Sequence, residues 1–238
     1  MRMHLSRARK IVAAVTALLS VALLAGCSEE KPNDRTITLT LIRYAETEGN
    51  SSGGVIDTTP PGPSLTPVGV QQASALANRL KAEKYDGIYA PQLVRTQHTA
   101  APMSKTMNEP VNVLPGLDEV GAGWYDGGPT DRADATFMVA PKAWVEGNRN
   151  FAIPGGATGN EFNGKFTGAV QRIYESGDNK PVAFSSGTSI MVWTLMNVSN
   201  PKTSLLTDHP LPNTGRIVIT GNPVIGWKLV DWDGVTGF

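Results

Sequence analysis

The chain has 238 residues, and its 21 basic and 21 acidic side chains give a formal net charge of zero. Without residues 1–26, which hold four basic and no acidic side chains, 17 basic and 21 acidic residues remain. This balance excludes the basic surface that a nucleic-acid partner requires. It also provides no polybasic patch for a lipid surface, so attachment to a membrane would have to be covalent.

The first residues have the pattern of an export signal, because four basic residues precede an apolar run over residues 11–24. That run is too short for a membrane span. Leu24-Ala25-Gly26-Cys27 matches a bacterial lipobox, in which cleavage precedes a cysteine that then takes diacylglycerol. An ordinary secretory peptide is the alternative, although Cys27 is the only cysteine in the chain. We therefore predict a signal peptide at residues 1–26, a lipidated tether at 27–35 and a domain at 36–238, anchored through Cys27 on the extracytoplasmic face of the cell membrane.

The rest of the chain alternates strand and helix patterns. Residues 36–43 place apolar side chains at every second position, which predicts a strand, and residues 50–64 have the composition of a loop. Thr66-Pro67 is typical of a helix start. Further helices are expected at 93–107, 133–145, 160–175 and 188–196, and further strands at 87–90, 111–114, 181–186, 216–220 and 227–230. This alternation predicts one α/β domain, a three-layer α/β/α sandwich with a mostly parallel central sheet.

Two segments indicate a family. Residues 41–47, extended to Asn50, resemble the Arg-His-Gly-Glu-Thr signature of the histidine phosphatase (phosphoglycerate mutase-like) superfamily, with Tyr44 at the position of the nucleophilic histidine. Residues 182–187 resemble its second motif, a strand ending in Ser-His-Gly, with Ser186 in place of the histidine. Further matches follow in the family's order at residues 65–73, 93–100, 117–121, 124–127 and 154–157. With the lipobox, the chain resembles a degenerate member of this superfamily on a mycobacterial-type lipoprotein.

The resemblance implies a set of site residues. Arg43 and Arg95 correspond to the phosphate-binding arginines, Asn50 to an amide that hydrogen-bonds the phosphoryl group, and Glu119 to the acid that protonates the leaving oxygen. Ligands of open α/β sheets bind beyond the carboxyl ends of the strands, where Arg43 and Ser186 are predicted, so we expect both in one crevice. Two guanidinium groups beside a helix N-terminus would form an oxyanion site.

Each assignment has a plainer alternative. Arg43 and Arg95 could be solvated surface residues, and Asn50 could simply form the turn that begins the loop. Asp118 and Asp126 compete with Glu119 for the role of the acid.

Tyr44 and Ser186, which replace the two histidines, are both weak nucleophiles at neutral pH. A phenol titrates near ~10, so forming the reactive anion of Tyr44 at pH 7 costs about 4 kcal/mol, although Arg43 and Arg95 could lower this pKa. Ser186 would need a general base. His98 and His209 lack the spacing of metal ligands, and we expect neither a metal nor a cofactor.

Three hypotheses follow from this pattern. The first is a pseudoenzyme that binds a phosphorylated or otherwise anionic ligand. The second is a working phosphatase whose nucleophile has moved to Tyr44 or Ser186. The third is a structural or partner-binding envelope protein with an idle pocket. The sequence identifies no protein partner.

Overall fold

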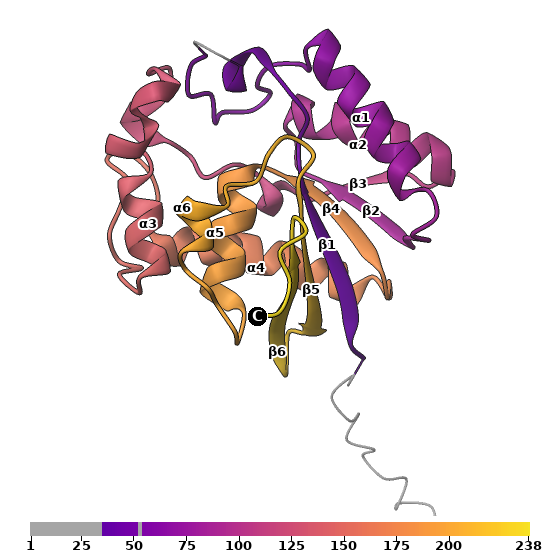
Figure 1. Ribbon diagram of the computed structural model, residues 1–238. Helices are drawn as coiled ribbons and strands as arrows, with labels where there is room; N and C mark the ends of the chain where they lie inside the picture. Colours follow the sequence, from indigo (N-terminus) through magenta and orange to yellow (C-terminus); the bar gives the residue numbers. More distant parts are fainter. Residues whose placement is uncertain (1–34, 52–53) are drawn as a thin grey trace, which may run out of the picture. The chain divides into compact units, whose positions relative to one another are not determined.

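A six-stranded mixed sheet forms the centre of the fold, in the strand order β3-β2-β4-β1-β5-β6 (Figure 1). The structure is a computed structural model that describes residues 35–51 and 54–238, so the predicted signal peptide and Cys27 lie outside the described residues. The strands are β1 (Ile37–Arg43), β2 (Gly87–Ala90), β3 (Val111–Val113), β4 (Pro181–Ser185), β5 (Arg216–Asn222) and β6 (Gly226–Trp232). Strands β1 to β4 pair in parallel, whereas β5 pairs antiparallel with both β1 and β6, which confirms the predicted mostly parallel sheet.

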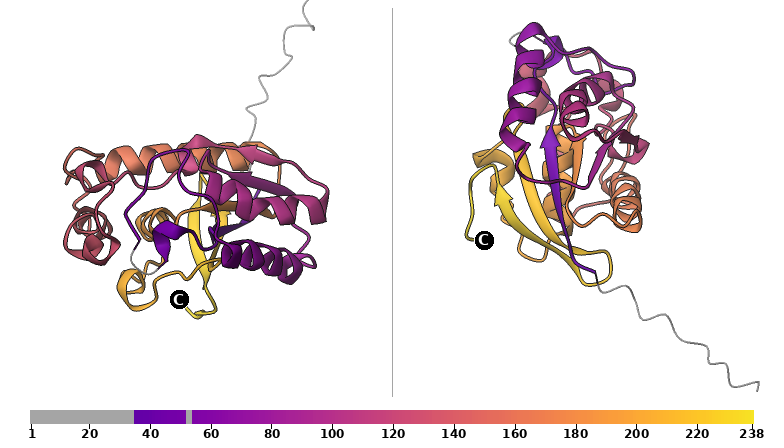
Figure 2. Two further views of the ribbon diagram at one scale, coloured as in Figure 1. Left: turned by 90° about the horizontal axis from the view of Figure 1, so that it is seen from above. Right: turned by 90° about the vertical axis from the view of Figure 1, so that its right-hand side faces the viewer.

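Helices cover both faces of this sheet (Figure 2). On one face lie α1 (Pro67–Leu80) and α2 (Val94–Met107), and on the other lie α4 (Gly159–Glu175) and α5 (Gly187–Asn197). Two shorter helices, α3 (Val139–Val145) and α6 (Leu205–Asp208), contribute to the core on the α4 and α5 side. The predicted three-layer α/β/α sandwich is therefore confirmed.

The side chains of β1 alternate between the two faces, as the pattern of the sequence predicts. Leu39 and Leu41 pack in the larger core with α4 and α5, whereas Ile42 packs in the smaller core with α1 and α2. Since both faces are covered, the strand is almost fully buried until Arg43, its last residue. This arrangement places Arg43 at the carboxyl end of the sheet.

The helix predicted at residues 133–145 is shorter than expected. The segment begins with the 3-10 helix η4 (Thr130–Ala135), and α3 starts only at Val139. Between them Thr136 has φ −128° and ψ −92°, which is outside the helical region. A non-helical residue such as Thr136 does not change the periodic spacing of apolar residues, so the interruption between η4 and α3 could not be predicted from the sequence.

The last two strands are longer than predicted. Gly221 and Asn222, which follow the strand predicted at 216–220, continue the ladder opposite Trp227 and Gly226. The Oδ1 atom of Asn222 accepts hydrogen bonds from the backbone N–H groups of Val224 and Ile225, both at 2.8 Å. Asn222, the last residue of β5, therefore stabilises the turn that follows it.

The chain enters the fold at Arg35, the last residue of the predicted tether. Its guanidinium group donates hydrogen bonds to the carbonyl oxygens of Tyr174 and Asp178, and its Cζ lies 4.7 Å from the centroid of the Tyr174 ring. In the part of the chain that the structure describes, no helix has the length and apolar composition needed to cross a bilayer.

Candidate functional site

A cavity of about 300 Å³ lies at the carboxyl ends of the parallel strands. Its wall comes from the segment after β1, the start of α2, the loop after β3 and the first turn of α5. The polar and charged side chains on this wall include Arg43, Tyr44, Asn50, Asp57, Arg95, Glu119 and Thr188. Apolar side chains, among them Val55, Ile56 and Phe137, complete it. The structure thus brings five of the residues singled out from the sequence into one place.

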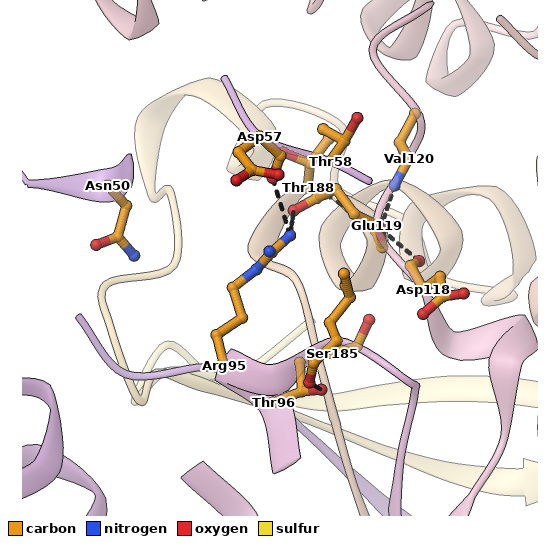
Figure 3. A network of polar contacts seen from close by, with 12 residues as sticks. Asn50, Asp57, Thr58, Arg95, Thr96, Asp118, Glu119, Val120, Ser185 and Thr188 are labelled. Atoms are coloured by element: carbon orange, nitrogen blue, oxygen red, sulfur yellow. Dashed lines mark hydrogen bonds and ion pairs between the residues drawn. The ribbon is translucent and has the colours of Figure 1, made fainter. Parts of the chain in front are cut away.

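Arg95 is the most deeply buried cation of this cavity, with 1% of its side chain exposed. Its Nη2 donates a hydrogen bond of 3.0 Å to the carbonyl oxygen of Asp57 and lies 3.8 Å from Oε2 of Glu119 (Figure 3). Its Cζ lies 4.8 Å from the ring centroid of Tyr44. The Nε and Nη1 atoms are buried and have no partner among the described residues. Because unpaired buried donors are costly, they indicate a place for an acceptor that comes from outside the chain.

Two glycines make room for the arginines. Gly62 has a φ of +67°, and a Cβ atom at this position would collide with Nη1 of Arg95. Gly187 begins α5, and a Cβ there would come within 2.9 Å of Cδ of Arg43. The positions of both guanidinium groups therefore depend on residues without a side chain.

Asn50 forms the turn that was the plainer alternative for this residue, and its hydrogen bond to a phosphoryl group stays a prediction. Its Oδ1 accepts a 2.8 Å hydrogen bond from the N–H of Thr47, and its own N–H donates to Oγ1 of Thr47 at 3.3 Å. This reciprocal pair closes the short 3-10 helix η1 (Glu48–Asn50). The amide nitrogen Nδ2 is buried and has no partner in residues 35–51 and 54–238. Asn50 thus shapes the turn with one end of its amide and leaves a donor free at the other.

Arg43 lines the cavity, but one nitrogen of its guanidinium group is already engaged in a hydrogen bond within the protein. Its Nη1 donates a hydrogen bond of 2.5 Å to the carbonyl oxygen of Leu211, which precedes β5. Its Cζ lies 5.7 Å from the ring centroid of Tyr44, so both arginines approach the same aromatic ring.

Tyr44 is buried, with 9% of its surface exposed, and its pKa is raised. Burial is the largest cause, followed by the negative charge of Glu119, and together they outweigh the opposing effects of Arg95 and Arg43. The sequence had suggested that the two arginines could lower the pKa of this phenol. Both arginines do lower this pKa, but the low-dielectric surroundings disfavour the phenolate more than the cations favour it, so the net shift is upward.

Ser186 is not among the residues that line the cavity, although it lowers the pKa of Glu119, a residue of the cavity wall. That it shares a crevice with Arg43 stays a prediction. Ser186 is fully buried at the N-cap position of α5, and its Oγ has no hydrogen-bond partner among the described residues. Strand β4 ends one residue earlier, at Ser185. Thr188, in the first turn of α5, lines the cavity.

Glu119 is the acidic residue of the three candidates that lines this cavity. Its side chain is 8% exposed, and burial raises its pKa, although Arg95 and, to a smaller extent, Ser186 and Arg43 oppose the effect. Asp126 instead accepts hydrogen bonds from the N–H and hydroxyl groups of Thr58, at 2.8 and 2.7 Å, and so holds the loop in place.

Asp57, Thr58 and Thr188 belong to the cavity wall but were not predicted. The first two lie in the loop over residues 50–64, for which the sequence offered only a loop composition. No motif in that stretch marks which of its side chains turn inward.

The two histidines of the described residues lie elsewhere. His98 is exposed on α2, and His209 follows α6, where its carbonyl oxygen accepts a hydrogen bond from Nε1 of Trp232 at 2.8 Å. Within the described ranges, no group of three or more His, Cys, Asp or Glu side chains could hold a metal ion.

The fold and the cavity together define an α/β domain with a guanidinium-lined pocket at the carboxyl ends of its strands. Residues 39–233 match the family described as histidine phosphatase superfamily (branch 1), and the chain belongs to this superfamily.

Curated relatives include a PE-PGRS family protein of Mycobacterium tuberculosis, which is 44% identical over 222 residues. That match covers 85% of this chain but only 37% of the relative, so the chain spans little more than a third of that protein. Phosphoserine phosphatase 1 of Hydrogenobacter thermophilus is 27% identical over 155 residues, or 64% of this chain and 71% of the relative.

Among solved structures, a mycobacterial glucosyl-3-phosphoglycerate phosphatase matches with a TM-score of 0.68 at 20% identity. The match covers 84% of this chain and all of the other, and it shows a shared fold. The same phosphatase has been solved with VO3 and with inorganic phosphate, so a structural relative binds a phosphate-containing ligand.

Proposed function

We propose that this chain is a lipid-anchored envelope protein whose histidine-phosphatase-like domain binds a phosphorylated or otherwise anionic ligand without the phosphohistidine reaction. The observation that supports this proposal best is a set of buried donors at one cavity that have no partner among residues 35–51 and 54–238, namely Nε and Nη1 of Arg95 and Nδ2 of Asn50.

A phosphoryl group suits these donors. Leaving a buried donor unpaired costs about 1–3 kcal/mol, and more for a charged group, so an incoming acceptor recovers a substantial free energy. A phosphoryl group offers several acceptor oxygens and a negative charge, and guanidinium groups bind it with charge-assisted hydrogen bonds. The phosphate complex of the structural relative supports the same choice of ligand.

The surroundings of Tyr44 and Ser186 favour binding over turnover. The raised pKa of Tyr44 keeps its phenol protonated at neutral pH, which removes the reactive anion. Ser186 is fully buried, and neither His98 nor His209 is among the residues that line the cavity, so no histidine there offers a general base.

Attachment to the membrane is the second part of the proposal. It is supported by the basic start, the apolar run over residues 11–24 and the lipobox that ends at Cys27. Radiolabelled palmitate should label the wild-type chain in a bacterial host, and Cys27→Ala should abolish the label. Equal labelling of both chains would contradict the anchor.

Isothermal titration with inorganic phosphate tests the binding site. We expect Arg95→Met to weaken phosphate binding by about 10- to 100-fold, the equivalent of one lost charge-assisted hydrogen bond. Lys228→Met, which removes an exposed cation from β6, is the control for net charge and should leave the affinity unchanged. Absence of phosphate binding by the wild type, or an unchanged affinity in Arg95→Met, would contradict the proposal.

A phosphatase with a relocated nucleophile is the second candidate, because Tyr44 does line the cavity. Release of phosphate from p-nitrophenyl phosphate by the wild type, abolished by Tyr44→Phe or Ser186→Ala, would establish it and replace the pseudoenzyme. An idle pocket predicts that phosphate leaves the melting temperature unchanged, since a ligand that binds only the folded state must raise it.

A further inference from the structure

The turn between β5 and β6 carries two exposed apolar side chains. Val224 and Ile225 are 67% and 69% exposed. Among the large apolar side chains of residues 35–51 and 54–238 only Trp124 is more exposed, and no other two neighbours in the chain are both exposed. Single exposed apolar residues are common on protein surfaces, whereas those that stand together indicate contact with another surface. We call Val224 and Ile225 the hairpin tip.

The backbone donors of the hairpin tip are already paired. The Oδ1 atom of Asn222, a fully buried residue, accepts the N–H groups of Val224 and Ile225, both at 2.8 Å, and Pro223 has no N–H group. Unpaired backbone groups are the main obstacle to placing a turn in hydrocarbon, because no water there replaces the missing hydrogen bond. For its donors, the hairpin tip therefore meets the requirement of an apolar environment.

The hairpin tip lies beside the point where the chain enters the fold. Gly221 pairs with Ile37 at the start of β1, and Nδ2 of Asn222 donates a hydrogen bond of 3.1 Å to the carbonyl oxygen of Arg35 (Figure 1). Arg35 follows Cys27 by eight positions in the sequence. A chain of this length spans at most about 28 Å. An anchor at Cys27 therefore keeps the hairpin tip close to the bilayer.

A weak contact is sufficient for a chain that is already anchored. Two apolar side chains alone would bind a bilayer poorly, but a tether makes the contact intramolecular and gives it a high effective concentration. A second copy of the chain is a poorer occupant, because a specific protein interface buries about 800 Å² on each partner, far more than two side chains provide. The bilayer is therefore the surface that fits the hairpin tip best.

The charged side chains at this end of the sheet are compatible with anionic lipids. Asp178 accepts a hydrogen bond of 2.5 Å from the hydroxyl group of Tyr89, and Asp86 accepts from the N–H groups of residues 179 and 180, so both carboxylates are occupied within the protein. Lys228, the first charged residue after the hairpin tip, is exposed and forms no ion pair within the described ranges. It is available to an anionic lipid headgroup.

We infer that the hairpin tip inserts into the surface of the bilayer to which the chain is anchored. The inference rests on the proposed function, since it needs the anchor at Cys27. It also determines how the domain stands on the membrane, because the cavity lies at the opposite end of β1, about 20 Å away for a strand of this length. The cavity then lies on the side away from the bilayer, where it receives a ligand from solution rather than a lipid headgroup.

Fluorescence quenching in vesicles tests the inference on the full, lipidated chain. Cys27 is the only cysteine of the chain and carries the lipid, so Ile225→Cys introduces a single free thiol for a nitrobenzoxadiazole label. The vesicles consist of phosphatidylethanolamine and phosphatidylglycerol, with or without doxyl-labelled phosphatidylcholine as the quencher. The matched control is Val70→Cys, because Val70 is 54% exposed in the first turn of α1, near the cavity end of the sheet (Figure 1). We expect the doxyl lipid to quench the label at residue 225 and to leave the label at residue 70 unquenched.

A second substitution tests whether the apolar character of the hairpin tip causes the contact. Val224→Asp, added to the labelled Ile225→Cys chain, should remove most of the quenching, because a carboxylate is costly in the apolar part of a bilayer. Val70→Asp in the same labelled chain adds the same charge far from the hairpin tip and should leave the quenching unchanged. Both valines are exposed, so both variants should keep the circular dichroism of the parent chain. Equal quenching in the two variants would overturn the inference.

The outcomes separate this inference from the proposed function. If the chain floats with the vesicles but the doxyl lipid quenches neither label, or both equally, the inference is wrong while the anchor stands. A label at residue 225 that is shielded from aqueous iodide without being quenched by the doxyl lipid would indicate a second copy of the chain on the hairpin tip, and would also overturn the inference. If the chain does not float with the vesicles, the proposed anchor is wrong and the inference fails with it.

Discussion

Replacing Arg95 with methionine should destabilise the domain by an amount that grows with pH. Methionine keeps much of the length of the side chain but removes the hydrogen bond to the carbonyl oxygen of Asp57, which is worth about 1.5–3 kcal/mol for a charged donor. The contact with the Tyr44 ring at 4.8 Å adds about 1–2 kcal/mol. Relief of the buried guanidinium offsets part of this loss. We therefore expect a net loss of about 2 kcal/mol at pH 5.

Glu119 supplies the pH dependence. Burial raises its folded-state pKa above the unfolded value of about 4.3, so its contribution to stability is full below that value and is lost as pH rises through the folded pKa. Arg95 is the strongest influence that opposes this shift. Without Arg95 the folded pKa rises further, and the variant keeps losing stability at pH values where the wild type has levelled off. The loss should therefore be larger at pH 8 than at pH 5.

Urea unfolding at pH 5 and pH 8, followed by circular dichroism, measures both losses. The control is the same substitution in a Glu119→Gln background, where the loss should depend less on pH; Asp118, whose pKa Arg95 also lowers, accounts for what remains. If Arg95→Met costs the same at both pH values in the wild-type background, the carboxyl group of Glu119 does not interact with Arg95 as the structure indicates.

Three further predictions concern Glu119 in the cavity wall, Gly62 beside Arg95, and the N-terminus of helix α4. In the wild type, sulfate, a dianion throughout this range, should bind more tightly at pH 5 than at pH 8, because burial raises the pKa of Glu119 and its protonation removes a repelling charge; calorimetry of Glu119→Gln should show a smaller change. Gly62→Ala should cost more stability than Gly127→Ala in urea unfolding, since both require a positive φ of roughly 1–2 kcal/mol but only Gly62 also displaces Arg95. Thr158→Ala removes the N-cap hydrogen bond of α4 and should cost about 1 kcal/mol by thermal unfolding while phosphate affinity is retained; a matching loss of affinity would contradict that separation.

The elements that the sequence predicted well are those whose pattern reflects burial. Strand β1 and helices α1 and α4 have regular apolar periods because each packs on the sheet, and Thr66 and Thr158 cap their helices as threonine does at many helix starts. The four-residue helix α6 and the break before α3 have no such period. They depend on local backbone geometry and tertiary packing, which a sequence pattern does not record.

Part of the candidate site could be found in the same way. Arg43, Asn50, Arg95 and Glu119 follow strands or begin helices at family spacings, and the structure brings all four to one cavity. The complete burial of Ser186 was not accessible, because it depends on how α5 packs after β4 ends. The net pKa of Tyr44 was not accessible either, since it depends on how much burial opposes the two arginines.

The hydrogen bond from Arg43 to Leu211 joins residues that are 168 positions apart. The motifs typical of the family end before residue 190, yet the pocket they contribute to is finished by a segment that is synthesised much later. A growing chain on the ribosome can therefore hold every motif residue while Arg43 still lacks the carbonyl group that orients it. A chain that ended after α5 would contain the motifs of its family but would lack the Leu211 carbonyl group that accepts the hydrogen bond from Arg43.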